Sequence, residues 1–251
     1  MRESKQNNPI TPDKFDAVLF DLDGVITDTA SVHAKCWKKM FDEYLKKRSA
    51  EKNEPFRPFD IETDYRLYVD GKPRFNGVRD FLTSRKIILL EGTHQDPSNA
   101  ETVGGLGNRK NELINEVIEN DGVEAYEATI TLARQLRDAG IKIAVVTSSQ
   151  NCDVVLKAVN IADLFEAKVD GNVIHEQNLN GKPAPDSFLE GAKRLGVQPA
   201  RTVVVEDALS GVQAGRNGKF GLVIGVDRKG NADELKKNGA DVVVKDLGEF
   251  L

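Results

Sequence analysis

Acidic side chains stand directly after two of the most apolar segments of the sequence. Asp21 and Asp23 follow "AVLF", with Gly24 behind them, and Glu206 and Asp207 end "TVVVED". Carboxylates that gather in one place repel each other and need a cation, and oxygen ligands beside a phosphate favour Mg²⁺. A carboxylate can also attack phosphorus and form an acyl phosphate. These residue types therefore point to metal-assisted phosphoryl transfer.

Hydroxyl groups and a lysine follow other apolar segments of the chain. The segment "KIAVVT" runs into Thr147, Ser148 and Ser149, and Lys182 lies in the loop "NGKPAPD". Phosphoryl transfer is catalysed mainly by positioning and by stabilising charge on the phosphoryl oxygens. Lys182, the Thr147 hydroxyl and the backbone N–H groups after Asp21 would supply that stabilisation, and Gly24 would let the chain turn closely.

Each of these signals has a plainer explanation when it stands alone. A lone DxDG can cap a helix or form an Asx turn. An EF-hand is disfavoured because Val25 and Val32 occupy ligand positions of that loop. The run "GGLGNRK" (104–110) lacks the GK[ST] ending of a phosphate-binding loop. The four signals gain weight because they stand at successive strand ends.

The elements that must position these residues form an alternating pattern. Five short runs, rich in β-branched residues, read as strands buried on both faces: "AVLF" (17–20), "KIAVVT" (142–147), "TVVVED" (202–207), "GLVIGV" (221–226) and "DVVVKD" (241–246). Helical segments between them end at Gly140 and Gly196. The pattern predicts an α/β fold with a Rossmann-like, doubly wound parallel sheet, which binds ligands beyond the carboxyl ends of its strands.

The interval between the first strand and the rest has a different pattern. Residues 29–121 read as helical, with "KIILL" (86–90) as the only candidate strand. We therefore expect a helical cap domain at 29–121, inserted into a catalytic core made of 1–28 and 122–251. The polar residues 1–13 are expected to be flexible.

Composition excludes several classes of protein. The chain has 251 residues, 39% hydrophobic and 30% charged, with a net charge of −5, which argues against a nucleic-acid binder that relies on bulk positive charge. No apolar run of about 18 residues predicts a membrane span, and no signal peptide is evident. Cys36 and Cys152 read as small buried hydrophobes. We expect a cytoplasmic monomer that binds neither nucleic acid nor membrane.

Four motifs together make the chain similar to the haloacid dehalogenase superfamily: "DLDGV", "VVTSS", "GKPAPD" and "VVVEDALSG". The resemblance implies an aspartyl-phosphate intermediate and Mg²⁺. It implies that Asp21 is the nucleophile and that Asp23 is the general acid/base and lends its backbone carbonyl to the metal. Thr147 and Lys182 match the motif hydroxyl and lysine. Glu206 and Asp207 match the terminal acids, with Asp207 as the more direct metal ligand.

Further positions resemble the β-phosphoglucomutase-like family within this superfamily. They are His33, Trp37, Gly71 and Arg74 of "GKPR", Lys110 of "RKN", and Ser148, Ser149 and Asn151 of "TSSQN". The resemblance implies that these residues bind a phosphorylated sugar and that His33 helps to position Asp23. The segments 47–60 and 80–105 make the cap longer than is usual in that family, and the first hydroxyl of the second motif is Thr147 instead of serine.

Three functions remain open on the sequence. The first is a sugar phosphomutase that converts β-glucose 1-phosphate to glucose 6-phosphate. The second is a phosphatase of small phosphorylated metabolites, gated by the cap. The third is a non-catalytic protein that binds phosphorylated ligands, which the intact pair of Asp21 and Asp23 disfavours because binding alone needs neither a nucleophile nor a proton donor.

Overall fold

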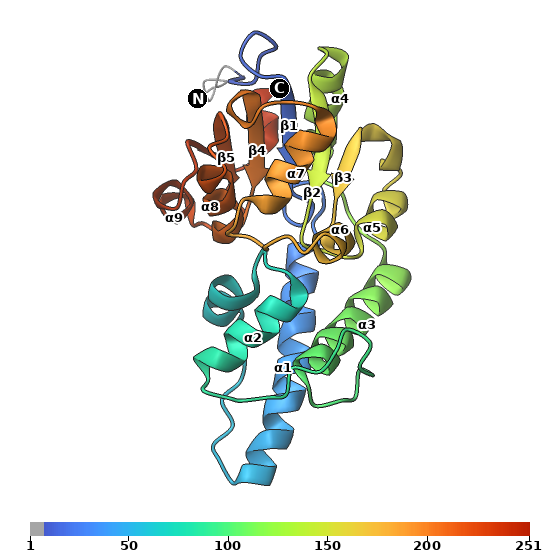
Figure 1. Ribbon diagram of the computed structural model, residues 1–251, viewed down its shortest axis with the longest axis vertical. Coiled ribbons are helices and arrows are strands. Elements are labelled where there is room, and N and C mark those ends of the chain that lie inside the picture. Colours follow the sequence, from blue (N-terminus) through green and yellow to red (C-terminus); the bar gives the residue numbers. More distant parts are fainter. Residues whose placement is uncertain (1–7) are drawn as a thin grey trace, which may run out of the picture. The chain divides into compact units, whose positions relative to one another are not determined.

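The computed structural model describes residues 8–251 and contains a parallel β-sheet (Figure 1). Its six strands lie in the order β3-β2-β1-β4-β5-β6, and all neighbours are parallel. The strands are β1 (Ala17–Phe20), β2 (Lys142–Val146), β3 (Ala167–Val169), β4 (Thr202–Glu206), β5 (Leu222–Val226) and β6 (Val242–Val244). The predicted α/β sheet is confirmed. The short strand β3 was not predicted.

The register of the central strands brings three chain segments to one edge of the sheet. Phe20 of β1 lies beside Val145 of β2 on one side and beside Val205 of β4 on the other. The residues that follow these three positions therefore emerge together at the carboxyl edge. This is the edge at which open parallel sheets bind ligands.

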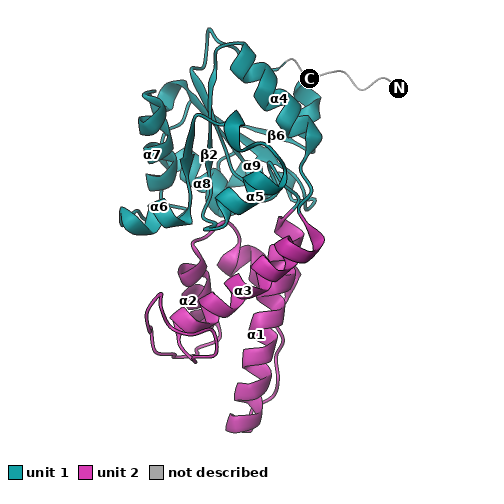
Figure 2. Ribbon diagram, turned by 90° about the vertical axis from the view of Figure 1, so that its right-hand side faces the viewer, with its two compact units in different colours: residues 1–28, 123–251 teal, residues 29–122 magenta. Residues whose placement is uncertain are grey.

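Helices cover both faces of the sheet, and Figure 2 shows α4 and α7 on opposite sides of the strands. Helices α7 and α8 pack on one face through Leu19, Val204, Phe188 and Val212. The helices of this part are α4 (Glu127–Asp138), α5 (Cys152–Ala158), α6 (Gly171–Glu176), α7 (Asp186–Leu195), α8 (Leu209–Asn217) and α9 (Ala232–Lys237). Short 3₁₀ turns lie at Ala162–Leu164, Pro199–Arg201 and Leu247–Phe250.

The chain divides into two compact units (Figure 2). The sheet unit comprises the chain up to Asp28 together with Val123–Leu251, and the helical unit comprises Thr29–Gly122. Within the sheet unit, the segment that leaves it and the segment that returns to it are paired. Thr27 bridges Ala125, and the Asp28 N–H donates to the Glu124 carbonyl over 2.9 Å.

The helical unit is built around an aromatic core. Phe41, Phe59 and Phe81 contact one another, with ring centroids 4.1–5.2 Å apart. The elements are α1 (Ala30–Lys52), a π-helix (Ile61–Val69), α2 (Arg74–Ser84) and α3 (Val103–Asp121). The candidate strand "KIILL" is not a buried strand, because Ile88 is 99% exposed and Leu90, which is 78% exposed, forms only an isolated bridge with Thr102.

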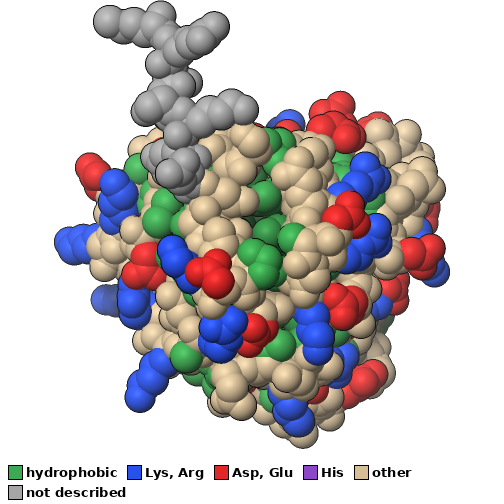
Figure 3. Space-filling model, turned by 90° about the horizontal axis from the view of Figure 1, so that it is seen from above, with side chains coloured by type: hydrophobic (Ala, Val, Ile, Leu, Met, Phe, Trp, Pro, Cys, Tyr) green, Lys and Arg blue, Asp and Glu red, His purple; other side chains and the backbone are tan. Residues whose placement is uncertain are grey.

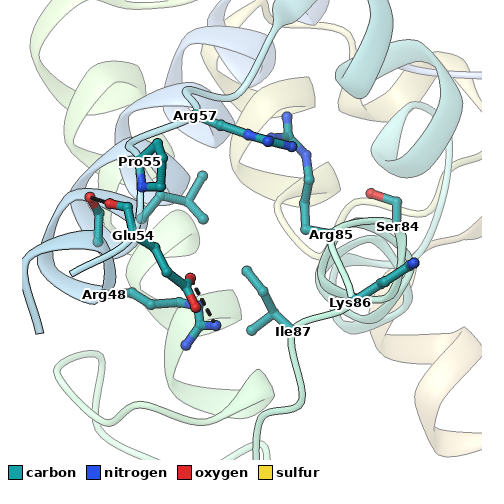
Figure 4. A pocket seen from close by; sticks show the side chains of 10 residues that line it. Arg48, Glu54, Pro55, Arg57, Ser84, Arg85, Lys86 and Ile87 are labelled. Atoms are coloured by element: carbon teal, nitrogen blue, oxygen red, sulfur yellow. Dashed lines mark hydrogen bonds and ion pairs between the residues drawn. The ribbon is translucent and has the colours of Figure 1, made fainter. Parts of the chain in front are cut away.

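The segments 47–60 and 80–105 of the helical unit line a shared pocket of about 430 Å³ (Figure 4). Its charged side chains are Arg48, Glu54, Arg57, Arg85 and Lys86. Arg48 pairs with Glu54 over 3.3 Å inside the pocket. Arg85 pairs with Asp64, beside the pocket, over 2.5 Å. The Arg85 pair thus ties the segment 80–105 to the π-helix, and an ion pair between Lys47 and Glu101 ties the two segments to each other.

The N-terminal prediction needs a correction. The expected flexible lead-in, residues 1–13, falls partly outside the described residues, but from Asn8 onward the chain is anchored. Ile10 is buried, and Arg201 donates to the Asp13 carbonyl over 3.2 Å. Burial of an apolar side chain and this hydrogen bond hold the segment in place. The polar composition of the segment gave no sign of these contacts.

Three further expectations from composition can be compared with the structure: mixed surface charge, the lack of a membrane span and buried cysteines. On the face drawn in Figure 3, acidic and basic side chains are intermixed. Among the described residues, none of the helices combines the length and the apolar character needed to cross a bilayer. Both cysteines are free and buried, which confirms their predicted role as small hydrophobes.

Candidate active site

Lys182 lies at the centre of the buried charges at the carboxyl edge. Its ammonium group donates to Oδ1 of Asp21 and to Oε1 of Glu206, both over 2.6 Å, and more weakly to the Val146 carbonyl over 3.3 Å. Three acceptors thus match the three protons of the group. The side chain also lies over the Phe188 ring, with Nζ 4.8 Å from the centroid.

The electrostatics of this cluster keep Lys182 charged. Burial opposes the ammonium form, but the facing carboxylates of Asp21 and Glu206 outweigh it, so the pKa of Lys182 lies above its usual value. Lys182 therefore cannot act as a base near neutral pH. It fixes one oxygen of Asp21, while Oδ2 of Asp21 accepts no hydrogen bond from the described residues.

Three buried carboxylates can hold a metal ion at this edge. Asp21, Glu206 and Asp207 each offer an oxygen, and these atoms lie within 4.8 Å of one another. Lys182 faces two of these carboxylates directly, and Lys229 lies 3.5 Å from Asp207. An all-oxygen set of acidic ligands fits a hard divalent cation.

The loop after β1 comes so close to Asp207 that only glycine fits at position 24. Gly24 has φ of +87°, and a Cβ there would lie 2.3 Å from Oδ2 of Asp207. Gly211 has a similar role beside Glu206, where a Cβ would lie 1.7 Å from Oε1. The tight turn expected at Gly24 is present, and Asp23 beside it is half-buried.

The second motif forms a hydrogen-bonded turn at the end of β2. The buried Thr147 hydroxyl accepts from the Ser149 N–H over 3.1 Å, and the Ser149 hydroxyl accepts from the Asn151 N–H over 3.2 Å. Ser148 is half-buried. Thr147 and Lys182 thus both lie at the carboxyl end of β2, since Lys182 reaches the Val146 carbonyl.

The structure brings three of the predicted residues of the helical unit together. The buried ammonium of Lys110 lies 2.7 Å from Nδ1 of His33, and 5.4 Å from the centre of the Trp37 ring. A lysine ammonium can only donate, so this contact suits a ring nitrogen of His33 that accepts. Trp37 also stacks on Phe41 and belongs to the core of this unit.

Arg74 is a half-buried cation that lacks an acidic partner among the described residues. Its Nη2 donates to Asn108 over 3.3 Å, its guanidinium lies over the Phe75 ring, and its buried Nε has no hydrogen-bond partner. Burial lowers the pKa of Arg74 to about 10, which still leaves it charged at neutral pH. Gly71 forms the turn before α2, with φ of +69°. A charge buried in this way is costly unless an anion approaches it.

Sequence reasoning missed two cations at the carboxyl edge. The loop after β5 carries Arg228, which donates to the Gly24 carbonyl over 2.9 Å, and Lys229, which lies 3.5 Å from Asp207. The segment "GVDRKGN" also follows a buried strand, so the strand-end argument applied to β5 could have found both.

The glycine-rich run "GGLGNRK" has a packing role. It lies inside α3, where a Cβ at Gly104 would lie 2.0 Å from the Thr93 carbonyl oxygen, and one at Gly105 would lie 2.2 Å from that of Ala100. The helix therefore needs glycine to approach the neighbouring backbone, which explains the run without a phosphate.

Comparison with known proteins assigns the family. A family model described as haloacid dehalogenase-like hydrolase matches residues 15–219. The chain belongs to this family. It is 49% identical to a protein named Beta-phosphoglucomutase from Mycobacterium bovis, over 96% of this chain and 93% of that protein. A protein of the same name from Bacillus subtilis is 32% identical, over 93% and 91%.

A solved structure of the family agrees with the fold. The crystal structure named beta-Phosphoglucomutase from Clostridium difficile has a TM-score of 0.71 and 26% identity, and covers 94% of this chain and 93% of its own. The predicted superfamily and fold are thereby confirmed. Arg228 and Lys229 lie beyond residue 219, where the match to the family model ends.

Proposed function

We propose that the chain is a sugar phosphomutase, a β-phosphoglucomutase that converts β-glucose 1-phosphate to glucose 6-phosphate through β-glucose 1,6-bisphosphate. The observation that carries this proposal is the position of Asp21. Its Oδ1 accepts a hydrogen bond from Lys182, which leaves its other oxygen available to attack phosphorus. The relatives named Beta-phosphoglucomutase support the choice of sugar.

The residues at the carboxyl edge divide the chemistry between them. Asp21 attacks phosphorus, the bond from phosphorus to the sugar oxygen breaks, and Asp23 gives its proton to that oxygen. In the other half of the cycle, Asp23 takes the proton of the free hydroxyl at the other end of the sugar phosphate. That oxygen attacks phospho-Asp21, which forms the bisphosphate and releases the Asp21 carboxylate. Lys182 and Thr147 supply positive charge and a hydrogen bond for the phosphoryl oxygens.

We propose that the metal is Mg²⁺, held by Asp21, Asp207 and the backbone carbonyl of Asp23, with support from Glu206. When bound, the ion would supply positive charge that offsets the negative charge on the phosphoryl oxygens. The donor set supports this assignment because it consists of oxygen atoms alone.

Removal of the metal should stop turnover, and Asp207→Asn should raise the Mg²⁺ concentration that gives half-maximal rate by about tenfold or more, because a carboxylate ligand is lost. The measurement is the rate against Mg²⁺ concentration after treatment with a chelator. Asp163→Asn serves as the control, since Asp163 is an exposed acid of the sheet unit outside the carboxylate cluster. Full activity in excess chelator would disprove the metal assignment.

The second phosphate of a bisphosphate needs its own cation. We propose Arg74, since it is half-buried without an acidic partner among the described residues, its buried Nε has no hydrogen-bond partner, and its guanidinium can meet phosphate oxygens through two parallel hydrogen bonds. We propose that Lys110, His33, Trp37 and Gly71 from the helical unit, with Ser148, Ser149 and Asn151 from the sheet unit, bind the sugar. A hydrolase of small phosphate esters has no use for a second anion site.

Arg74→Ala should lower kcat/KM for β-glucose 1-phosphate by about 10²-fold or more, because a desolvated charge pair is lost. Hydrolysis of a small chromogenic phosphate ester should change much less. Product formation is followed by NMR, with trace bisphosphate present, which separates glucose 6-phosphate from free phosphate. Arg79→Ala is the matched control, because Arg79 lies on the same helix and pairs at the surface with Glu91.

The wild-type protein decides between the two enzyme activities. If it releases only glucose and free phosphate, the mutase proposal is wrong and the phosphatase reading replaces it. If it turns over no phosphate compound with Mg²⁺ present, the non-catalytic reading replaces both.

A further inference from the structure

Arg228 makes contacts in several directions from the loop after β5. Its Nε donates to the Gly24 carbonyl over 2.9 Å, and its Nη1 donates to the Lys245 carbonyl and to Asp246, both over 3.2 Å. Its guanidinium lies over the Tyr126 ring, with Cζ 3.6 Å from the centroid. The side chain is only 15% exposed. One rigid group thus joins the loop after β1, the loop after β6 and Tyr126.

Tyr126 extends this connection to the far end of the loop after β1. Its hydroxyl donates to Asp28 over 2.9 Å, and its N–H donates to the Ile26 carbonyl over 2.9 Å. Burial and the bond to Asp28 raise the pKa of Tyr126 to about 12, so the phenol keeps its proton at neutral pH. The loop from Gly24 to Asp28 is therefore held at its start by Arg228 and at its end by Tyr126.

The position of Gly24 matters because it directly adjoins two acids of the site. It follows Asp23, and a Cβ on it would overlap the Asp207 carboxylate. No side chain fits between Gly24 and Asp207, and a shift of Gly24 away from Asp207 would carry Asp23 along. The hydrogen bond from Arg228 opposes that second movement.

We infer that Arg228 is a positioning residue for phosphoryl transfer, which sets the Asp23–Gly24 segment against Asp207 by holding the Gly24 carbonyl. This inference rests on the proposed function for the role of Asp23. Lysine cannot replace it, because a single ammonium on a flexible stem cannot stack on Tyr126 and bond Gly24 and Asp246 together. The ion pair with Asp246 does not explain the burial, since Asp246 is 43% exposed and such pairs contribute little to stability.

The test compares Arg228→Met and Arg228→Lys with Arg201→Met. Arg201 forms two 2.7 Å hydrogen bonds with Asp16 just before β1, at the opposite end of that strand, and is 43% exposed. Its loss removes a charge and an ion pair of the same unit without touching the Asp23–Gly24 segment. The readouts are kcat, KM, thermal midpoint and the Mg²⁺ dissociation constant from calorimetry.

We expect both Arg228 variants to lose about 10²-fold in kcat, as displacement of a catalytic group by about 1 Å would cause. KM should change less than threefold, Mg²⁺ binding should weaken severalfold, and methylguanidinium added to Arg228→Met should restore part of kcat. Arg201→Met should keep its kcat. The thermal midpoints of Arg228→Met and Arg201→Met should differ by only a few degrees.

Two outcomes would overturn the inference. The first is a kcat of Arg228→Lys equal to that of wild type. The second is a lowered kcat of Arg228→Met that is explained by a lowered thermal midpoint and returns to the wild-type value when the assay is cooled. If wild type proves to be a phosphatase, the same comparison is made on phosphate release, which uses the same Asp23–Gly24 segment. A failed mutase assignment and a failed role for Arg228 therefore give different results.

Discussion

Asp21→Asn is expected to lower kcat by at least about 10⁴-fold, because the substitution removes the nucleophile and leaves a group of the same shape. The amide oxygen of asparagine can still accept the bond from Lys182, so the fold should survive. The measurement is glucose 6-phosphate formation in steady state, together with phosphate labelling of the protein under acid quench. Wild type should carry an acid-stable, base-labile phosphate and the variant should carry none.

Asp16→Asn supplies the matched control, since Asp16 immediately precedes β1 as Asp21 immediately follows it, and its pairing with Arg201 is exposed. That variant should retain wild-type kcat. Near-normal turnover in Asp21→Asn, or a labelled variant, would assign the phosphorylated residue elsewhere.

Lys182→Met is expected to abolish turnover and also to destabilise the metal-free protein by about 3–5 kcal/mol. The reason is that Asp21 and Glu206 lose the ammonium that lies 2.6 Å from each of them, and breaking a buried ion pair leaves uncompensated charge in a medium of low polarity. Urea unfolding, with and without Mg²⁺, measures the stability. Addition of Mg²⁺ should recover part of the loss, because the ion replaces the missing positive charge.

The double variant Lys182→Met/Glu206→Gln separates the two effects. Removal of one buried negative charge should restore much of the stability, while turnover stays absent because the phosphoryl oxygens still lack their cation. Lys193→Met, which removes a highly exposed lysine of α7, should change neither property. Recovery of turnover along with stability would show that Lys182 acts only as a structural residue.

The sheet and the core of the site could be predicted because the same sequence pattern, an apolar strand followed by polar residues, indicates both. A strand buried on two faces must be apolar throughout, so the polar residues directly after it mark the edge where ligands bind. Asp21, Thr147 and Asp207 follow such strands directly, and Glu206 is the last residue of β4. Strand β3 escaped prediction because only Val169 of its three residues is buried.

Other features could not be predicted because they depend on contacts between distant segments. The hydrogen bond of Arg228 to Gly24 joins residues 204 positions apart, and the glycines of α3 are set by carbonyl groups of Thr93 and Ala100. The apolar run at 86–90 suggested a strand, but Ile88 finds no partner surface in the described chain. Local pattern gives the type of an element, while its neighbours decide which of its side chains are covered.

The pairing of Thr27 with Ala125 means that the inserted segment begins and ends at one hydrogen-bonded point. For such a closed loop, the entropy cost of joining the ends grows only with the logarithm of its length, by about 0.6 kcal/mol for each doubling. A longer inserted segment would therefore cost the sheet almost nothing in free energy. In polymer terms, the inserted segment is a loop whose two ends are joined on the sheet unit. Its length and sequence can therefore change, and with them the range of substrates, while the catalytic residues of the sheet stay in place.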